Sequence, residues 1–333
     1  MTRSDGRPVI GLVGAGGISR AHLPALLELG SRVLVLRRTG AEALVAAHSE
    51  APVPLEIVDS LAELLDRSDV VDVVTPTPTH LDIVRAALEA GCDVICEKPL
   101  ARTAADAREL ADCAAATGSR LFPAHVVRYF PEYLALKRAV DRGEAGRLAV
   151  LRFLRSGSFP ASGWFADLEA SGGVIMDQMI HDLDQARLLA GPVRSVSALR
   201  TRSSRDGHRL EVGHVNLTHA SGAISQCSGV WGPPSLTFST EYAVTGDVGT
   251  LRHSSLDGGG GGAGLEDDSF DVLDPYGPYT AQLREFFAAM TGGPAPRVSV
   301  EDGVEAVRIA EAALESVATG APSRRTPGRS SRP

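Results

Sequence analysis

The fold of this chain is decided near its start by residues 9–19, which read VIGLVGAGGIS. The apolar run Val9–Val13 predicts a buried strand, and closely spaced glycines lead from it into His22–Leu29, which has the apolar periodicity of a helix. In such a strand–turn–helix unit the first glycine makes the tight turn, and the next lets an anion approach the free N–H groups of the helix. The context therefore predicts a dinucleotide-binding turn. Its expected binding residues are Gly14, Gly16, Gly17 and Ile18.

Strand-like and helical segments alternate up to residue 124. The predicted strands are 9–13, 32–36, 55–58, 70–75, 93–96 and 121–124, and the predicted helices are 22–29, 41–48, 61–65, 81–90 and 104–117. Thr79 with Asp82 resembles a capping box at the start of helix 81–90. This alternation predicts an α/β fold, with residues 1–124 forming a Rossmann-type, doubly wound parallel sheet.

A different pattern follows residue 124. Helices are predicted at 131–142, 173–190, 279–290 and 300–318, and strands at 148–156, 196–202, 212–220, 223–230, 237–245 and 250–253. Strands in succession, with turns at 220–222 and 245–247, predict an α+β domain over 125–321 with an antiparallel sheet. One face would be covered by helices, and the other would face a partner subunit. The glycine run 257–264 is expected to be a flexible loop, and 322–333 a disordered tail.

Composition narrows the class of protein. The 333 residues carry a net charge of −8 without a concentrated basic run, so neither a nucleic acid nor a membrane surface is an expected partner. No stretch approaches the roughly 20 apolar residues of a membrane span, and no signal segment precedes the first strand. The four cysteines lack the spacing of a metal site, so we expect free thiols, no metal and a cytoplasmic location.

The end of the second strand bears on the choice of cofactor. An acid normally stands there to hold a ribose 2′-hydroxyl, but Arg37 and Arg38 occupy the place and no acid follows before Glu42. Because guanidinium pairs with phosphate through two parallel hydrogen bonds, the arginines favour NADP over NAD. They are also compatible with two solvated surface side chains.

Two polar segments follow neighbouring strands at the edge where open α/β sheets bind ligands. TPTPTH, residues 75–80, begins where strand 70–75 ends, and EKP, residues 97–99, follows strand 93–96. Pro99 restricts the backbone after Lys98, and a cis peptide would fit there. The residues expected to line the cofactor are Thr75, Pro76, Thr77, His80, Glu97 and Lys98.

The predicted helix 173–190 carries a second polar group. Asp177, His181 and Asp184 are spaced by four and three residues, which places them on one helix face. An imidazole flanked by carboxylates suits proton transfer. Alone, the pattern equally fits a hydrogen bond along a helix face or part of a metal site, although spacing suggests no third metal ligand.

Taken together, these motifs resemble the glucose–fructose oxidoreductase, inositol dehydrogenase and rhizopine catabolism (Gfo/Idh/MocA) family. The resemblance rests on the glycine turn, on TP followed by His80, on EKP, and on GG followed by Asp177, His181 and Asp184, in this order and spacing. Later segments at 279–286, 298–303 and 319–322 are similar too. Ser19 at the third small position of the turn departs from the family pattern without consequence. The missing acid after the second strand puts NAD in doubt.

The resemblance implies an NAD(P)-dependent oxidoreductase that exchanges a hydride at a sugar, cyclitol or related polyol CH–OH group. It implies Lys98, Asp177 and His181 as catalytic residues. It also implies a large open antiparallel sheet in the second domain, through which a homodimer or homotetramer assembles. Further candidates for contact with a small-molecule substrate are His125, Arg128, Arg155 and Trp164, of which Trp164 also fits a purely packing role. Two alternatives remain, a cofactor-binding sensor without turnover and a reductase of an imine or biliverdin-type substrate. The joint presence of Lys98 and His181 favours an enzyme.

Overall fold

The computed structural model describes residues 7–29, 32–205, 207–256 and 277–324, which form two compact units. In this described part, the first unit contains the residues up to 130 together with 277–304, and the second contains 131–256 together with 305–324. The expected boundary at 124/125 placed residues 277–304 in the second domain. They lie in the first unit because Leu283 and Phe286 belong to the same core as Leu23 and Leu26.

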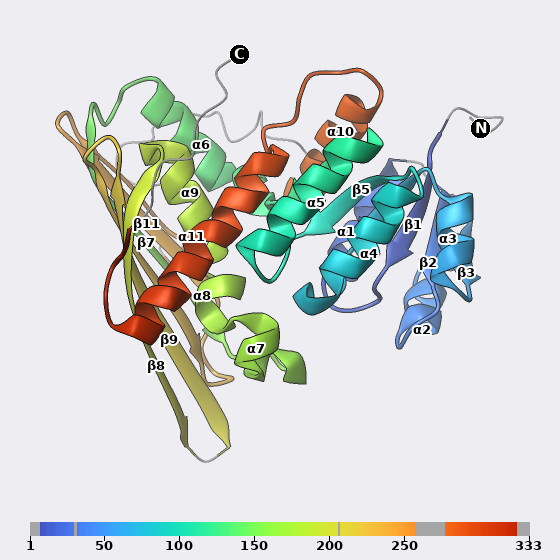
Figure 1. Ribbon diagram of the computed structural model, residues 1–333, viewed down its shortest axis with the longest axis horizontal. Helices are drawn as coiled ribbons and strands as arrows, with labels where there is room; N and C mark the ends of the chain where they lie inside the picture. Colours follow the sequence, from blue (N-terminus) through green and yellow to red (C-terminus); the bar gives the residue numbers. More distant parts are fainter. Residues whose placement is uncertain (1–6, 30–31, 206, 257–276, 325–333) are drawn as a thin grey trace. The chain divides into compact units, whose positions relative to one another are not determined.

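The first unit contains a six-stranded sheet, entirely parallel, in the order β3-β2-β1-β4-β5-β6 (Figure 1). The doubly wound prediction is confirmed, because the strand order reverses direction at β1. The strands are β1 Val9–Val13, β2 Arg32–Leu36, β3 Leu55–Val58, β4 Val70–Val73, β5 Asp93–Glu97 and β6 Leu121–Ala124. The helices are α1 Ser19–Glu28, α2 Ala41–Ala46, α3 Leu61–Arg67, α4 His80–Glu89, α5 Ala104–Thr117 and α10 Pro278–Met290, with short 3₁₀ turns at 77–79 and 126–129.

Helix α4 begins without the predicted capping box. The Thr79 hydroxyl donates to Thr75 Oγ1 at 2.7 Å and to the Pro76 carbonyl at 2.8 Å, so it does not cap the helix. The capping box does not form because the Thr79 hydroxyl bonds acceptors in the preceding turn instead of the backbone of the helix. The turn that it closes holds the segment after β4 in place.

The second unit contains a seven-stranded sheet in the order β12-β11-β7-β10-β9-β8-β13. Its strands are β7 Leu148–Ser158, β8 Val193–Arg205, β9 His208–His219, β10 Ile224–Gly232, β11 Ser239–Gly246, β12 Thr250–Ser254 and β13 Ser323–Arg324. Neighbours are antiparallel except for the parallel pair β7 and β10. The expected tail began at 322, but Ser323 and Arg324 pair with β8, while 325–333 and the glycine run 257–264 lie outside the described residues.

Side chains of β9 and β10 alternate between buried and exposed, so helices cover one face of this sheet. Helices α8 Gly173–Asp177 and α9 Ile180–Ala190 pack against β7, β9 and β10 (Figure 1). The unit also contains α6 Pro131–Asp141, α7 Leu168–Ser171, a short 3₁₀ turn at 163–166 and most of α11 Val300–Thr319. In the described part of the chain, no helix combines the length and apolarity that a membrane crossing needs.

The prediction of one helix over 173–190 is wrong, because α8 and α9 are separated at Gln178 and Met179. The Met179 N–H bonds the Val174 carbonyl five residues back, at 2.9 Å, which widens the turn. Packing explains the break: the Gln178 amide donates to the Arg155 carbonyl at 2.9 Å, and Met179 lies tightly against two glycines of the sheet, Gly213 and Gly229. The periodicity of a helix reflects only nearby residues, so it could not predict these contacts with strands far away in the sequence.

Candidate active site

The glycine turn of the first unit has the shape that a phosphate group requires. Gly14 has a φ of +121°, and a Cβ there would lie 2.7 Å from the Val74 carbonyl oxygen, so only glycine fits. At Gly16 and Gly17 a Cβ would meet no atom of the described chain within 4 Å, so the space beside them is open. No described side chain caps the start of α1, where Ile18 stands half-buried. Free N–H groups and open space fit a dinucleotide pyrophosphate.

Ser19 has a defined role in this turn. Its side chain is buried, and its hydroxyl donates to the Gly16 carbonyl at 2.7 Å. The departure from a glycine or alanine at this position therefore tightens the turn without filling the space where the phosphates would lie.

The arginines after β2 lie beside the same turn. A Cβ at Gly40 would be 2.9 Å from the Ala15 carbonyl, so the loop after Arg38 packs on the glycine turn. The Arg37 guanidinium donates to Asp59 and, at 2.5 Å, to Glu42, whereas Arg38 is exposed. Because Arg37 is paired with two carboxylates, both acids near the end of β2 have a cationic partner.

His80 joins the two segments that follow β4 and β5. Its ring nitrogens lie 2.9 Å from the carbonyl oxygens of Thr75 and Pro99, and the side chain is fully buried. Burial lowers the pKa of His80 and favours the neutral ring, which donates to one of the two carbonyls; the Cys96 thiol also lies 3.5 Å from its Nδ1. The prediction had His80 contacting the cofactor, but the structure places it beneath the two segments, where it holds them together.

The backbone on both sides of Lys98 is held by hydrogen bonds. The Lys98–Pro99 peptide bond is cis, and the Lys98 side chain is half-buried. The Lys98 N–H donates to Glu97 Oε2 at 3.0 Å, and the Pro99 carbonyl contacts His80. Glu97 was expected to line the cofactor, but it is only 5% exposed and its carboxylate contacts the protein interior. Thr75 is half-buried, Pro76 exposed and Thr77 buried in the neighbouring segment.

Sequence reasoning missed two residues of this region, His22 and Asp72. His22 of α1 is fully buried, with Nδ1 2.9 Å from Asp72 Oδ2 and Nε2 3.1 Å from Glu97 Oε1. An acid within the apolar run 70–74 and a histidine on the apolar face of the first helix were the available signals, because buried charges require partners.

The second unit supplies Asp177, the last residue of α8, and His181, the second residue of α9. Both side chains are half-buried, whereas Asp184 is only 1% exposed. The three residues thus differ in accessibility, although the spacing predicted one shared face. The break at Gln178 and Met179 interrupts the regular rotation on which that prediction depended.

The start of α8 is held by a buried carboxylate. Glu211 Oε1 accepts the Val174 N–H at 3.0 Å, and Arg202 Nε lies 3.1 Å from Glu211 Oε2. Gly173 has a φ of +70°, and a Cβ there would overlap the Glu211 carboxylate. Gly173 is therefore needed to let Glu211 reach the first turn.

The secondary candidates are mostly interior. Arg155 is 4% exposed and donates to both Asp182 oxygens, at 2.9 and 3.1 Å, and to the Tyr133 hydroxyl. Arg128, equally buried, donates to the Arg297 carbonyl at 2.8 Å and to Asp302. These contacts give both guanidinium groups a structural role instead of the expected substrate contact. His125 is 1% exposed, and Trp164, which packs on Phe165 with ring centroids 4.0 Å apart, is half-buried.

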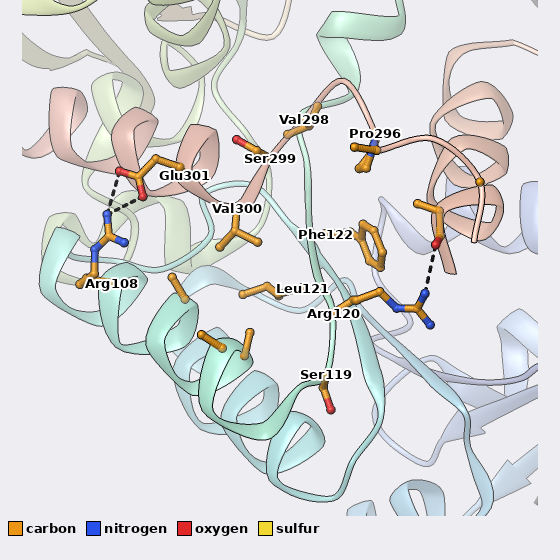
Figure 2. A pocket seen from close by; sticks show the side chains of 16 residues that line it. Arg108, Ser119, Arg120, Leu121, Phe122, Pro296, Val298, Ser299, Val300 and Glu301 are labelled. Carbon is orange, nitrogen blue, oxygen red and sulfur yellow. Dashed lines mark hydrogen bonds and ion pairs between the residues drawn. The ribbon is translucent and has the colours of Figure 1, made fainter. Parts of the chain in front are cut away.

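A cavity of about 720 Å³ lies elsewhere in the first unit, between α5, β6 and the segment before α11 (Figure 2). Its lining is largely apolar, and the predicted site residues are not part of it. Arg108 pairs with Glu301 at one end, at 2.6 Å, and Arg120 donates to the Ala289 carbonyl at the other, at 3.0 Å. Figure 2 marks both interactions with dashed lines. Its polar groups are thus paired within the protein, so the chemistry of the glycine turn and Lys98 defines the candidate site.

Comparison with known proteins identifies the family of this chain. Residues 9–125 match the oxidoreductase family with an NAD-binding Rossmann fold, GFO_IDH_MocA, and residues 133–252 match the GFO/IDH/MocA C-terminal domain. The chain is 31% identical to the 1,5-anhydro-D-fructose reductase of Ensifer adhaerens, over 93% of this chain and 96% of that protein. It is 27% identical to the inositol 2-dehydrogenase of Rhizobium meliloti strain 1021, over 92% and 96%.

Among solved structures, GenD2 from gentamicin A biosynthesis, in complex with NAD, superposes with a TM-score of 0.82 at 25% identity, covering 96% of this chain and 97% of GenD2. The glycine turn, the sheet order and both matched domains lead to one conclusion: this chain belongs to the GFO/IDH/MocA family of oxidoreductases with an NAD-binding Rossmann fold.

Proposed function

We propose that this protein is an NAD(P)-dependent dehydrogenase that exchanges a hydride at a CH–OH group of a sugar, cyclitol or related polyol. The observation that carries the proposal is the combination of an open, uncapped glycine turn with Lys98 anchored directly after β5. The names of the relatives, which include a reductase of an anhydrosugar and an inositol dehydrogenase, support the substrate class.

In this proposal the nucleotide lies on the glycine turn, with Gly14, Gly16, Gly17 and Ile18 around its phosphates. A bound nicotinamide supplies the acceptor for the hydride of the substrate alcohol. The residues of the chain then handle the proton and the oxygen. His181 accepts the hydroxyl proton as general base, a role that typically contributes ~10²–10⁴-fold in rate.

Lys98 donates a hydrogen bond to the reacting oxygen and stabilises its developing negative charge. Asp177 binds a second hydroxyl or orients the His181 ring. Whether Lys98 or His181 takes the proton first is a question for the pH dependence of variants at each position. This joint role rests on the motifs, on the family and on the chemistry of the three side chains.

For the cofactor we propose NADP in preference to NAD, supported by the surroundings of Arg38. Arg37 is paired with Asp59 and Glu42, so each of these acids already has a cationic partner. Arg38 is exposed on the loop that packs against the glycine turn, where a guanidinium suits a 2′-phosphate. Replacing Arg38 by Ala should lower kcat/KM for NADP about tenfold and leave that for NAD within twofold; equal effects on both would contradict the assignment.

We further propose a homodimer or homotetramer that assembles through the open face of the second sheet, where Leu199 and Ile224 are exposed. Mass measurement in solution tests it. A cytoplasmic location is proposed from the four cysteines, all of which are described and none of which forms a disulfide.

The decisive experiment is a turnover screen of cyclitols, anhydrosugars and aldoses with NAD and NADP, using the full chain and His181→Ala. Turnover at least ~100-fold lower in the variant, with an unchanged cofactor Kd, is expected. His214→Ala is the matched control, because His214 is an exposed histidine of β9 that bonds Ser228.

Equal turnover in wild type and His181→Ala would refute the role of His181. Tight cofactor binding without any turnover would favour a sensor, and NADPH oxidation by imines alone would favour an imine-type reductase.

A further inference from the structure

The buried ring of His22 is an imidazolium. Each of its nitrogens faces a carboxylate oxygen, Asp72 Oδ2 at 2.9 Å and Glu97 Oε1 at 3.1 Å. A neutral imidazole has one N–H and one lone pair, so it would direct that lone pair at a carboxylate. Against two ionised carboxyl groups, only the ring with two N–H donors satisfies both neighbours. Although burial opposes it, the bond to His22 lowers the pKa of Glu97.

The remaining neighbours of His22 agree with a positive charge. Its side chain is fully buried, Asp72 is fully buried, and Glu97 is 5% exposed, so water does not screen the three groups. Tyr279 of α10 packs edge-on against the His22 ring, with ring centroids 5.7 Å apart, and its phenol ring carries no positive charge that would oppose the imidazolium. Burial opposes the charge, but Asp72 and Glu97 outweigh it and raise the pKa of His22 to about 10.

The three groups come from three elements that each carry part of the candidate site. His22 lies on α1, which follows the glycine turn, Asp72 lies on β4 ahead of Thr75, and Glu97 ends β5. The second oxygen of Glu97 accepts the Lys98 N–H at 3.0 Å. A continuous chain of hydrogen bonds therefore runs from Asp72 through His22 and Glu97 to the backbone of Lys98.

We propose that His22 is a positioning residue, whose charged ring, held by Asp72, fixes Glu97 and thereby the backbone from which Lys98 reaches the substrate. The inference rests on the proposed role of Lys98. Without the ring, two buried carboxylates lose their shared cation, and Glu97 turns away from the Lys98 N–H to relieve its desolvation. Lys98 then loses the anchor that Glu97 provides, while the bond of Pro99 to His80 is kept.

The test compares His22→Gln, the isosteric Asp72→Asn, and the double variant, assayed below their melting temperatures. A catalytic group displaced by about 1 Å loses up to ~10²-fold in rate, so we expect kcat to fall at least ~10-fold in each single variant. The KM for substrate and the cofactor Kd should stay within threefold. The double variant should be no slower than His22→Gln, because Asp72 acts through His22.

Hydrogen exchange gives a second measurement that needs no turnover. The Lys98 amide should exchange at least ~10-fold faster in His22→Gln, while amides of β9 in the other unit keep their rates. Asp93→Asn is the matched control. Asp93 begins β5, at the opposite end from Glu97, and accepts the Arg120 N–H at 2.7 Å, so its loss should leave both kcat and Lys98 exchange unchanged.

A folded His22→Gln with wild-type kcat and wild-type Lys98 exchange would overturn the inference, as would additive losses in the double variant. If His22→Gln does not fold, Asp72→Asn alone decides by the same two readouts. Absence of turnover in the wild type would count against the proposed function, whereas faster Lys98 exchange in the variants would still support the anchoring role of His22.

Discussion

Replacing Gly173 by Ala should destabilise the second unit far more than an ordinary glycine substitution. Gly173 has a φ of +70°, a conformation that costs an L-residue about 1–2 kcal/mol. The added Cβ would also overlap Glu211 Oε1 and lie 2.9 Å from Leu168 Cδ2. Glu211 must then move and release the Val174 N–H, a hydrogen bond to a charged group worth about 1.5–3 kcal/mol. The expected loss is roughly 3–5 kcal/mol.

Gly222 provides the matched control. It has a φ of +90° in the hairpin between β9 and β10, and a Cβ there meets no atom of the described chain within 4 Å. Gly222→Ala should therefore cost only the conformational part, about 1–2 kcal/mol. The difference of about 2 kcal/mol between the two variants isolates the contact with Glu211.

Urea unfolding followed by tryptophan fluorescence is a suitable assay. Both tryptophans of the chain, Trp164 and Trp231, lie in the second unit, and Trp231 is 2% exposed between Phe159 and Phe165. Equal losses in Gly173→Ala and Gly222→Ala would refute the argument. A Glu211→Ala background should shrink the difference, because the group that clashes is then absent.

Three further outcomes are expected. Gly16→Ala should leave the melting temperature of the cofactor-free protein unchanged but weaken cofactor binding at least ~10-fold, because its Cβ points into the open space beside the turn. Gly14→Ala should instead destabilise the cofactor-free protein, because its Cβ contacts the Val74 carbonyl. Calorimetry of both variants checks these outcomes. The pKa of His22 is raised from 6.5 to about 10, so the charged ring stabilises the fold fully below about pH 6.5 and progressively less as the pH rises toward 10. The difference in urea midpoint between wild type and His22→Gln should therefore shrink from pH 6 to pH 9. A constant difference would contradict this pH dependence. Phe286→Ala should cost about 3–5 kcal/mol, since this fully buried ring stacks on Phe122 with centroids 5.0 Å apart; a loss below 1 kcal/mol in thermal unfolding would show that the first core is built differently.

Local patterns sufficed for the first sheet and its ligand-binding edge. The sequence directly predicts the apolar strands, the glycines that end helices and strands, and the polar segments after β4 and β5. Each of these features is determined by neighbours within about 30 residues. The accessibility of each polar side chain was harder to infer. His80 and Glu97 were expected to meet a ligand, but they bond the interior of the protein. Their partners come from other parts of the fold, the segment after β5 for His80 and helix α1 for Glu97.

The motif around residues 9–19, with its strand before and helix after, determined by itself that the chain begins with a dinucleotide-type α/β unit. Only the tertiary structure showed that Gly16 borders open space while Gly14 is confined by Val74, that α8 and α9 separate at Met179, and that residues 277–304 pack with the first unit. The physical reason is the range of the interactions. Periodicity and turn chemistry are encoded between near neighbours, whereas burial, charge pairing and steric limits arise between residues that only folding brings together.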